Sequence, residues 1–167
     1  GINPVVVHGG DGSVTYERYR GAIENVRITV RGPLDRILEY VLPHEVAHVV
    51  LALSFRQPLP RWLDEGVAML SESQSQRTRQ DLTVSQLLTS GSLMPLDRIL
   101  QVDEYPKDHR ELVGFYACSY SLTEYLVAQG GRQRLLLFVR DGGRVGWERS
   151  LQEHYGGSLD ELESSWR

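Results

Sequence analysis

His44-Glu45-Val46-Ala47-His48 is the stretch on which the interpretation of the whole chain depends. Two histidines four positions apart on a helix lie on one face, about one turn apart, so both rings can reach a single metal ion. A glutamate directly after the first histidine lies beside such an ion, where it can hold and deprotonate water. The segment from His44 to Phe55 is apolar on almost every face of the expected helix. We therefore expect half of a metal site on a buried helix.

The composition predicts one globular domain over residues 1–167. A net charge of -4 argues against nucleic acid as a partner, because phosphate binding usually leaves a basic footprint. Cys118 is the only cysteine, so neither a disulfide framework nor a thiolate metal cluster is expected. No uninterrupted apolar run reaches the length of about 20 residues that spans a bilayer, so no membrane span is expected. Because the chain begins with Gly1, we expect a processed form or a fragment.

Residues 1–32 are expected to consist mainly of strands. Pro4 to His8 is typical of a short strand that ends at a glycine-rich turn, and a second extended stretch is expected around Val14. From Asn25 to Arg31, apolar and polar residues alternate, with Val26, Ile28 and Val30 on one face. This pattern predicts a half-buried strand. Its polar outer face suits an edge strand along which an extended peptide is bound.

Residues 33–167 are expected to be mainly helical. Apolar residues recur at helical spacing from Leu34 to Leu42, and Pro43 then predicts either a kink or a new helix with the proline in its first turn. The next helix is expected from about Arg61 to Ser73, followed by a surface connection over 71–79. The predicted fold is α+β, with a small N-terminal β-sheet that includes an edge strand and a mostly helical remainder around the buried His44 to His48 helix.

Capping signals mark the helices near the C-terminus. Asp108 and Glu111 are spaced as a capping box, which predicts a long helix that ends at Gly130-Gly131. Further helices are expected over 133–139 and 147–155. Ser158 and Glu161 form another capping-box pattern, which predicts a last helix.

A catalytic zinc ion takes three protein ligands and keeps a fourth position for water. Sixteen residues separate His48 from Glu65, enough for one helix to end, the chain to turn and a second helix to present a carboxylate to the same metal. Asp64 is the alternative ligand, with Glu65 then a helix N-terminal charge that the helix dipole favours.

His44-Glu45-x-x-His48 followed by Trp62-Leu63-Asp64-Glu65-Gly66-Val67-Ala68 resembles the gluzincin metallopeptidases, in particular the short peptidase MA-like domains and the zinc aminopeptidases. The resemblance implies a minimal zincin-like domain and one zinc ion held by His44, His48 and Glu65, with Glu45 as general base. In the same families, a glutamate seven residues past the ligand glutamate supports a ligand histidine. Glu72 stands at that position.

The segment from Tyr116 to Leu126 is similar to a family helix that begins with a catalytic tyrosine. The resemblance implies that Tyr116 donates a hydrogen bond to the developing oxyanion, with Tyr120 as its rival one turn along. Gly21-Ala22-Ile23-Glu24-Asn25 is similar to a motif of the zinc aminopeptidases whose glutamate binds the free amino group of the substrate. Glu24 would have that role here.

The expected function is zinc-dependent hydrolysis of a peptide or protein substrate, with cleavage inside a chain or at its amino end left open. One alternative is an inactive zincin fold that serves as a binding or assembly module. Another is a metallohydrolase of a non-peptide amide. The oligomeric state and the cellular compartment are left open.

Overall fold

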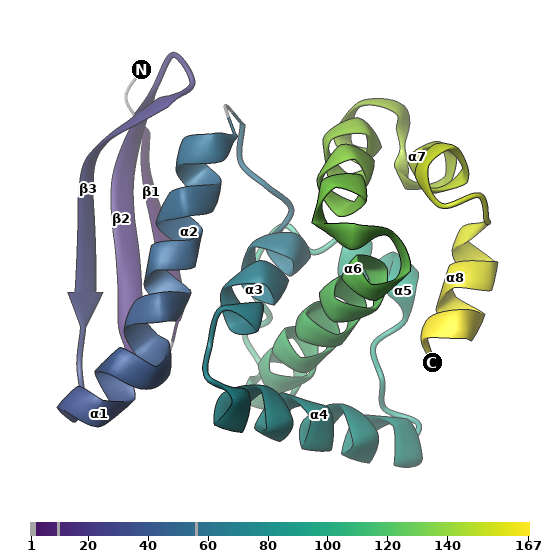
Figure 1. Cartoon of the computed structure of the whole chain (residues 1–167), viewed down its shortest axis with the longest axis horizontal. Helices are drawn as coiled ribbons and strands as arrows, with labels where there is room; N and C mark the ends of the chain where they lie inside the picture. Colours follow the sequence, from purple (N-terminus) through teal and green to yellow (C-terminus); the bar gives the residue numbers. More distant parts are fainter. Residues whose placement is uncertain (1–2, 10, 56) are drawn as a thin grey trace. The chain divides into compact units, whose positions relative to one another are not determined.

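The computed structural model describes residues 3–9, 11–55 and 57–167. The chain divides into two compact units, one formed by residues 1–59 and 67–78 and the other by residues 60–66 and 79–167. Within the first unit, Figure 1 shows helix α2 beside a three-stranded sheet. The prediction of an α+β zincin-like fold is confirmed. The prediction of a single domain over 1–167 stays a prediction.

The sheet of the first unit is antiparallel, with the strand order β1-β2-β3. Strand β1 spans Asn3–Gly9, β2 spans Gly12–Tyr19 and β3 spans Ala22–Val30. Each of the three extended stretches expected from the sequence forms a strand. In the part of the chain that the structure describes, β3 pairs only with β2, so it is an edge strand as predicted.

The expected alternation of β3 is interrupted by a bulge. Thr15 pairs with Arg27 and Glu17 pairs with Glu24, so β3 holds one more residue than β2 over this interval, and Asn25 has a positive φ of 53°. A bulge of this kind interrupts the alternation of faces where it occurs, and Val26 lies within it. The prediction that Val26 lies on the half-buried face is wrong, because this residue is 41% exposed, whereas Ile28 packs on the face that the alternation predicts.

The same bulge brings Ile23 and Ile28, five positions apart, to one face of the sheet. Both pack against a buried cluster made by Val14, Tyr16 and Ala52, the last of which belongs to α2. Apolar burial between the sheet and the helix stabilises the unit and fixes which side of α2 faces the sheet.

Helix α2 spans Leu42–Ser54 and continues without a break from α1, Leu34–Arg36, and a π-helix, η1, Ile37–Val41. Pro43 lies in the first turn of α2, as one of the two sequence alternatives predicted. Proline has no N–H to give to the carbonyl four residues earlier, and in the π-helical turn just before it the N–H of Leu42 donates to the carbonyl of Ile37, five residues earlier.

The C-terminal end of α2 is capped by a side chain from the sheet. Arg18 on β2 donates hydrogen bonds to the carbonyl oxygen of Phe55 at 2.7 Å and to that of Ala52 at 3.3 Å. The last carbonyl groups of a helix lack intrahelical donors and carry partial negative charge. A guanidinium therefore stabilises them both by donating hydrogen bonds and by its positive charge. This contact anchors α2 on the sheet.

Helix α3 spans Arg61–Leu70, and the boundary between the two units falls inside it, between Gly66 and Val67. It ends three residues before the predicted end. Helix α4, Gln74–Thr89, follows after a short turn, so the prediction of a surface connection over 71–79 is wrong for most of its length. No residue of α4 is buried. The polar residues that suggested a loop therefore belong to an exposed helix.

In the second unit, α5 spans Leu96–Leu100 and α6 spans His109–Val145. Asp108 caps α6 as predicted, because its carboxylate accepts hydrogen bonds from the backbone N–H groups of Arg110 and Glu111. The predicted end at Gly130-Gly131 is present as a kink, where Gly131 has φ 75° and ψ 169°. Positive φ of this kind is accessible to glycine at little cost.

Helices α7, Trp147–His154, and α8, Leu159–Trp166, complete the second unit (Figure 1). The Trp147 ring packs against Phe138, with centroids 5.4 Å apart, and the buried hydroxyl of Ser150 donates to the Phe138 carbonyl at 2.7 Å. Ser158 and Glu161 form the predicted capping box at the start of α8. These contacts fold the C-terminal helices back on α6.

By length and composition alone, one helix of the described residues passes the test for a membrane span. It runs from Leu34 to Ser54 and reaches a mean hydropathy of 1.3. The core helix of a soluble protein passes the same test. In addition, α2 contains His44, Glu45 and His48, and ionisable side chains are costly in free energy inside the hydrocarbon of a bilayer. The expectation of no membrane span therefore stays a prediction.

Candidate metal centre

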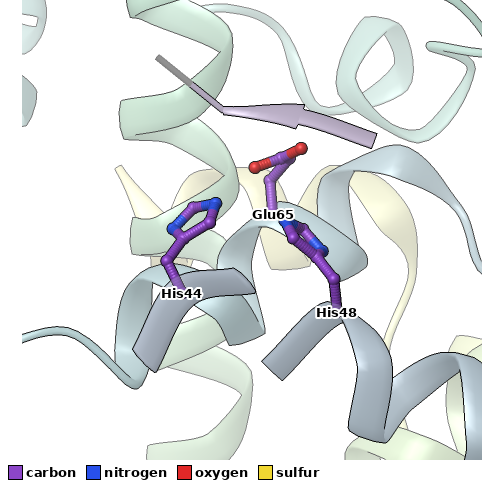
Figure 2. Close-up of side chains that lie close together, drawn as sticks. All are labelled: His44, His48 and Glu65. Carbon is purple, nitrogen blue, oxygen red and sulfur yellow. The ribbon is translucent and has the colours of Figure 1, made fainter. Parts of the chain in front are cut away.

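Three buried side chains converge in the described residues. His44 and His48 come from α2 and Glu65 from α3, and their ligand atoms all lie within 4.8 Å of one another. Figure 2 shows the two imidazole rings and the carboxylate turned toward a common point. The two rings meet edge to face, with centroids 4.8 Å apart. The structure thus brings together the three residues that the sequence selected as metal ligands.

The ring of His44 is held by Glu72. Its Nδ1 lies 2.7 Å from Glu72 Oε1, and both side chains are largely buried. A carboxylate only accepts, so Nδ1 donates in this contact, and in the neutral imidazole the lone pair that a metal requires is then on Nε2. Glu72 thus has the contact expected of a supporting residue, although it lies two residues past the end of α3.

Glu65 is held by a residue that the sequence analysis did not select. The hydroxyl of Tyr105 donates a hydrogen bond to Glu65 Oε1. Burial, together with the neighbouring Glu65 carboxylate, raises the pKa of Tyr105 far above its ordinary value, so the phenol keeps its proton and remains a donor. Tyr105 lies in an irregular segment with no periodic pattern, so no local sequence signal marks it.

Gly66, the residue after Glu65, allows α3 to approach α6 closely. A Cβ at this position would lie 2.5 Å from the carbonyl oxygen of Ser119 and 2.8 Å from Cβ of Thr123. Neither distance is compatible with a side chain. The glycine in the Trp62 to Ala68 motif therefore has a packing role, and it sets the depth at which Glu65 is buried.

Glu45 is 1% exposed and lies against the first residue of β2. A Cβ at Gly12 would clash with Glu45 Oε1 and would lie 2.8 Å from its Cδ. The backbone of Gly12 thus forms one wall of the space that holds the carboxylate. The sequence gives no sign of this contact, because 32 residues lie between the two positions.

A family model described as the peptidase MA superfamily matches residues 25–167. The chain belongs to this superfamily. The match contains α2, α3 and α6, and so every site residue predicted from the sequence except Glu24. No curated protein and no solved structure gives a significant match.

For a peptidase MA member, the donor set at this centre fits a metal ion. Two imidazoles and one carboxylate are the protein ligands of many catalytic zinc sites, in which ligand atoms about 2.0–2.2 Å from the ion lie roughly 3.4 Å apart. The observed separations, all within 4.8 Å, are of the same order as that range. Asp64 does not belong to the group, which favours Glu65 over Asp64 as the third ligand.

The two candidate tyrosines of the superfamily helix differ in their surroundings. Tyr120 is 1% exposed and its hydroxyl donates to Glu124 at 3.3 Å. Burial and this carboxylate raise its pKa. Tyr116 is only half-buried, and its ring lies 6.1 Å from that of Tyr105, which contacts Glu65. The surroundings therefore favour Tyr116 as the group that meets a substrate.

Glu24 is not brought toward the metal centre by any described contact. It pairs with Glu17 across β2 and β3, whereas its neighbour Ile23 packs on the side of the sheet that faces α2. Successive residues of a strand point to opposite faces, so Glu24 lies on the face away from α2. It also precedes the first residue of the superfamily match.

Proposed function

We propose that this chain is a zinc-dependent peptidase. The observation that carries the proposal is the buried group of His44, His48 and Glu65 in a member of the peptidase MA superfamily, with Glu45 one residue from a ligand. His44, His48 and Glu65 would hold the ion. When bound, zinc supplies Lewis-acid polarisation and lowers the pKa of water.

Glu45 is the general base of the proposed reaction. Its carboxylate takes a proton from the attacking water and transfers it to the nitrogen of the leaving amine. Its near-complete burial keeps competing water away from the carboxylate and strengthens each charge interaction there. Gly12 limits the orientations that the side chain can adopt.

Tyr116 donates its hydroxyl proton in a hydrogen bond to the oxyanion that develops on the scissile carbonyl. A donor placed in advance stabilises this charge without reorganisation. The half-buried position of Tyr116, beside the ring of Tyr105, supports this role over Tyr120, whose side chain is almost completely buried.

We further propose that the substrate is an extended peptide bound along β3. The strand lies at the edge of the sheet that packs against α2, and most of its residues are exposed. Its unpaired backbone groups can hydrogen-bond an added strand. Since Glu24 lies on the opposite face of the sheet from α2, nothing in its position supports recognition of a free amino group.

The decisive experiment compares wild-type protein, Glu45→Gln and Glu153→Gln on a mixed peptide library, with and without a zinc chelator. Glu153 is an exposed glutamate on α7 and serves as the matched control. We expect cleavage by wild type and Glu153→Gln that the chelator abolishes, and a loss of at least a hundredfold for Glu45→Gln with zinc still bound.

Three other results would contradict the proposal. Zinc binding without cleavage by wild type would indicate a binding module with a zincin fold. Cleavage of non-peptide amides alone would indicate the other alternative. Peptide cleavage by Glu45→Gln at the wild-type rate would exclude Glu45 as the base.

A further inference from the structure

The third ligand of the proposed metal centre has its own hydrogen-bond donor. Glu65 is fully buried, and Tyr105 donates to its Oε1 from the segment that joins α5 to α6. Both residues belong to the second compact unit. A buried carboxylate is costly unless hydrogen bonds satisfy its oxygens, so this donor has a direct energetic effect on Glu65.

Tyr105 is itself held in place by the turn of α3 that precedes Glu65. The guanidinium of Arg61 lies over the Tyr105 ring at 4.7 Å from the centroid, and its Nη1 donates to the phenol oxygen at 3.4 Å. Nε of Arg61 donates to the carbonyl oxygen of Asp103 at 3.3 Å. One helical turn therefore carries both the carboxylate and the group that fixes its donor.

Aromatic contacts restrict the other side of the ring. The centroid of Tyr105 lies 6.4 Å from that of Phe115 and 6.1 Å from that of Tyr116. With a cation on one side and two rings from α6 nearby, the phenol has little freedom to turn away from Glu65.

We propose that Tyr105 is a positioning residue that fixes the rotation of the Glu65 carboxylate for metal binding. The inference rests on the proposed function, since it assumes that Glu65 is a ligand. A carboxylate turns easily about its terminal bond, and a hydrogen bond to one oxygen restricts that turn. Residues that orient metal ligands in this way raise metal affinity although they do not touch the ion.

This role separates Tyr105 from Tyr116, its aromatic neighbour. The hydroxyl proton of Tyr105 is directed to Glu65, and Arg61 donates to the same phenol oxygen. Tyr105 therefore supports the ligand, whereas Tyr116 remains the proposed partner of the substrate. Glu72 and Tyr105 then act in parallel, Glu72 on His44 and Tyr105 on Glu65.

The test compares zinc affinity, measured by competition with a chelator of known affinity, for wild type, Tyr105→Phe and Tyr155→Phe. The control also loses a tyrosine hydroxyl that donates within the second unit, because Tyr155 bonds to the carbonyl of Leu126 at 3.2 Å. We expect Tyr105→Phe to bind zinc about 10-fold to 100-fold more weakly, and Tyr155→Phe to bind like wild type.

A second variant, Arg61→Met, keeps most of the side-chain volume but removes the cation over the ring. It should lower zinc affinity by a smaller factor than Tyr105→Phe. Circular dichroism must show that each variant is folded before its affinity is compared.

The outcomes separate this inference from the proposed function. If wild type binds zinc and the zinc affinity of Tyr105→Phe is within threefold of the wild-type value, the positioning role is wrong, whatever the peptidase assay shows. If wild type binds zinc but cleaves no peptide, peptidase function fails while a loss of affinity in Tyr105→Phe still supports the role of Tyr105. If wild type binds no zinc, both proposals are wrong.

Discussion

The backbone N–H of Ser73 donates a hydrogen bond to the carbonyl oxygen of Glu39 at 3.1 Å. In a regular α-helix, that carbonyl would accept from residue 43, but Pro43 has no N–H to donate. The helix widens into η1 just before the proline, and the chain beyond α3 supplies a donor. Ser73 directly follows Glu72, whose carboxylate reaches His44. The proline that precedes the histidine motif thus creates an acceptor that anchors the supporting glutamate.

The contact between Glu72 and His44 predicts a loss of zinc affinity in Glu72→Gln. The amide keeps the size of the carboxylate but removes the charge that holds the Nδ1 proton and makes the other nitrogen a better ligand. We expect zinc affinity to fall about 10-fold to 100-fold. Chelator competition measures it, with Glu153→Gln as the control. Equal affinities for Glu72→Gln and the control would show that this contact does not support the metal.

The wall that Gly12 forms beside Glu45 predicts a separate effect on turnover. In Gly12→Ala the new methyl group would displace the Glu45 carboxylate, because the three heavy atoms nearest to it all belong to Glu45. We expect the zinc ligands to keep their places. A misplacement of about 1 Å at a reacting group costs on the order of a hundredfold in rate. We expect kcat to fall by at least about tenfold, with zinc affinity unchanged.

Gly143→Ala is the matched control for Gly12→Ala, because a Cβ at that exposed position of α6 meets no atom within 4 Å. Steady-state kinetics on a cleaved library peptide measures both variants. Wild-type kcat in Gly12→Ala would mean that the Glu45 side chain moves aside without consequence.

The features that the sequence predicts well are those formed by residues close together in the chain. The spacing of His44 and His48 and the caps at Asp108 and Ser158 depend on residues within one or two helical turns, so their patterns are visible in the chain itself. Glu65 is more distant, and a resemblance to known motifs was needed to select it.

The contacts that the sequence does not show are those between distant segments. Tyr105 contacts Glu65 across 39 intervening residues, and Gly12 contacts Glu45 across 32. Neither tyrosine nor glycine forms a recognisable pattern there. The alternation in β3 also failed at Val26, because a bulge at Asn25 depends on pairing with β2 and not on the order of residues in β3 alone.

Gly66→Ala and Gly114→Ala are expected to change stability in opposite directions. Both glycines are helical and buried, and alanine favours a helix over glycine by about 1 kcal/mol. At Gly114 a Cβ meets nothing within 4 Å, so we expect a gain of up to about 1 kcal/mol. At Gly66 the Cβ would strike Thr123 and the Ser119 carbonyl, and overpacking typically costs about 1–3 kcal/mol.

Urea unfolding of the two variants measures this difference. The close packing of α3 on α6 at Gly66 is contradicted if Gly66→Ala is as stable as Gly114→Ala. Loss of zinc affinity in Gly66→Ala, at a temperature where it is folded, would further link this packing to the position of Glu65.

Asp141 predicts how stability depends on pH in the second unit. Its carboxylate accepts from Arg140 at 2.9 and 3.0 Å, from Arg144 at 3.2 Å and from His154 Nε2 at 3.0 Å. The hydrogen bonds from Arg140 and His154 hold the pKa of Asp141 well below its ordinary value of 3.8. A lowered folded-state pKa stabilises the fold at pH values above the unfolded-state pKa, and this stabilisation is lost as pH falls below it.

The unfolding free energy of wild type should therefore exceed that of Asp141→Asn from pH 5 to 7, and the difference should shrink as pH falls below about 4. Comparing the two proteins at each pH cancels the contribution of the other carboxylates. Asp103→Asn, which changes an exposed carboxylate, is the control and should show no such trend. A difference between wild type and Asp141→Asn that stays constant down to pH 2.5 would mean that the charge of Asp141 is not what His154 and the two arginines stabilise.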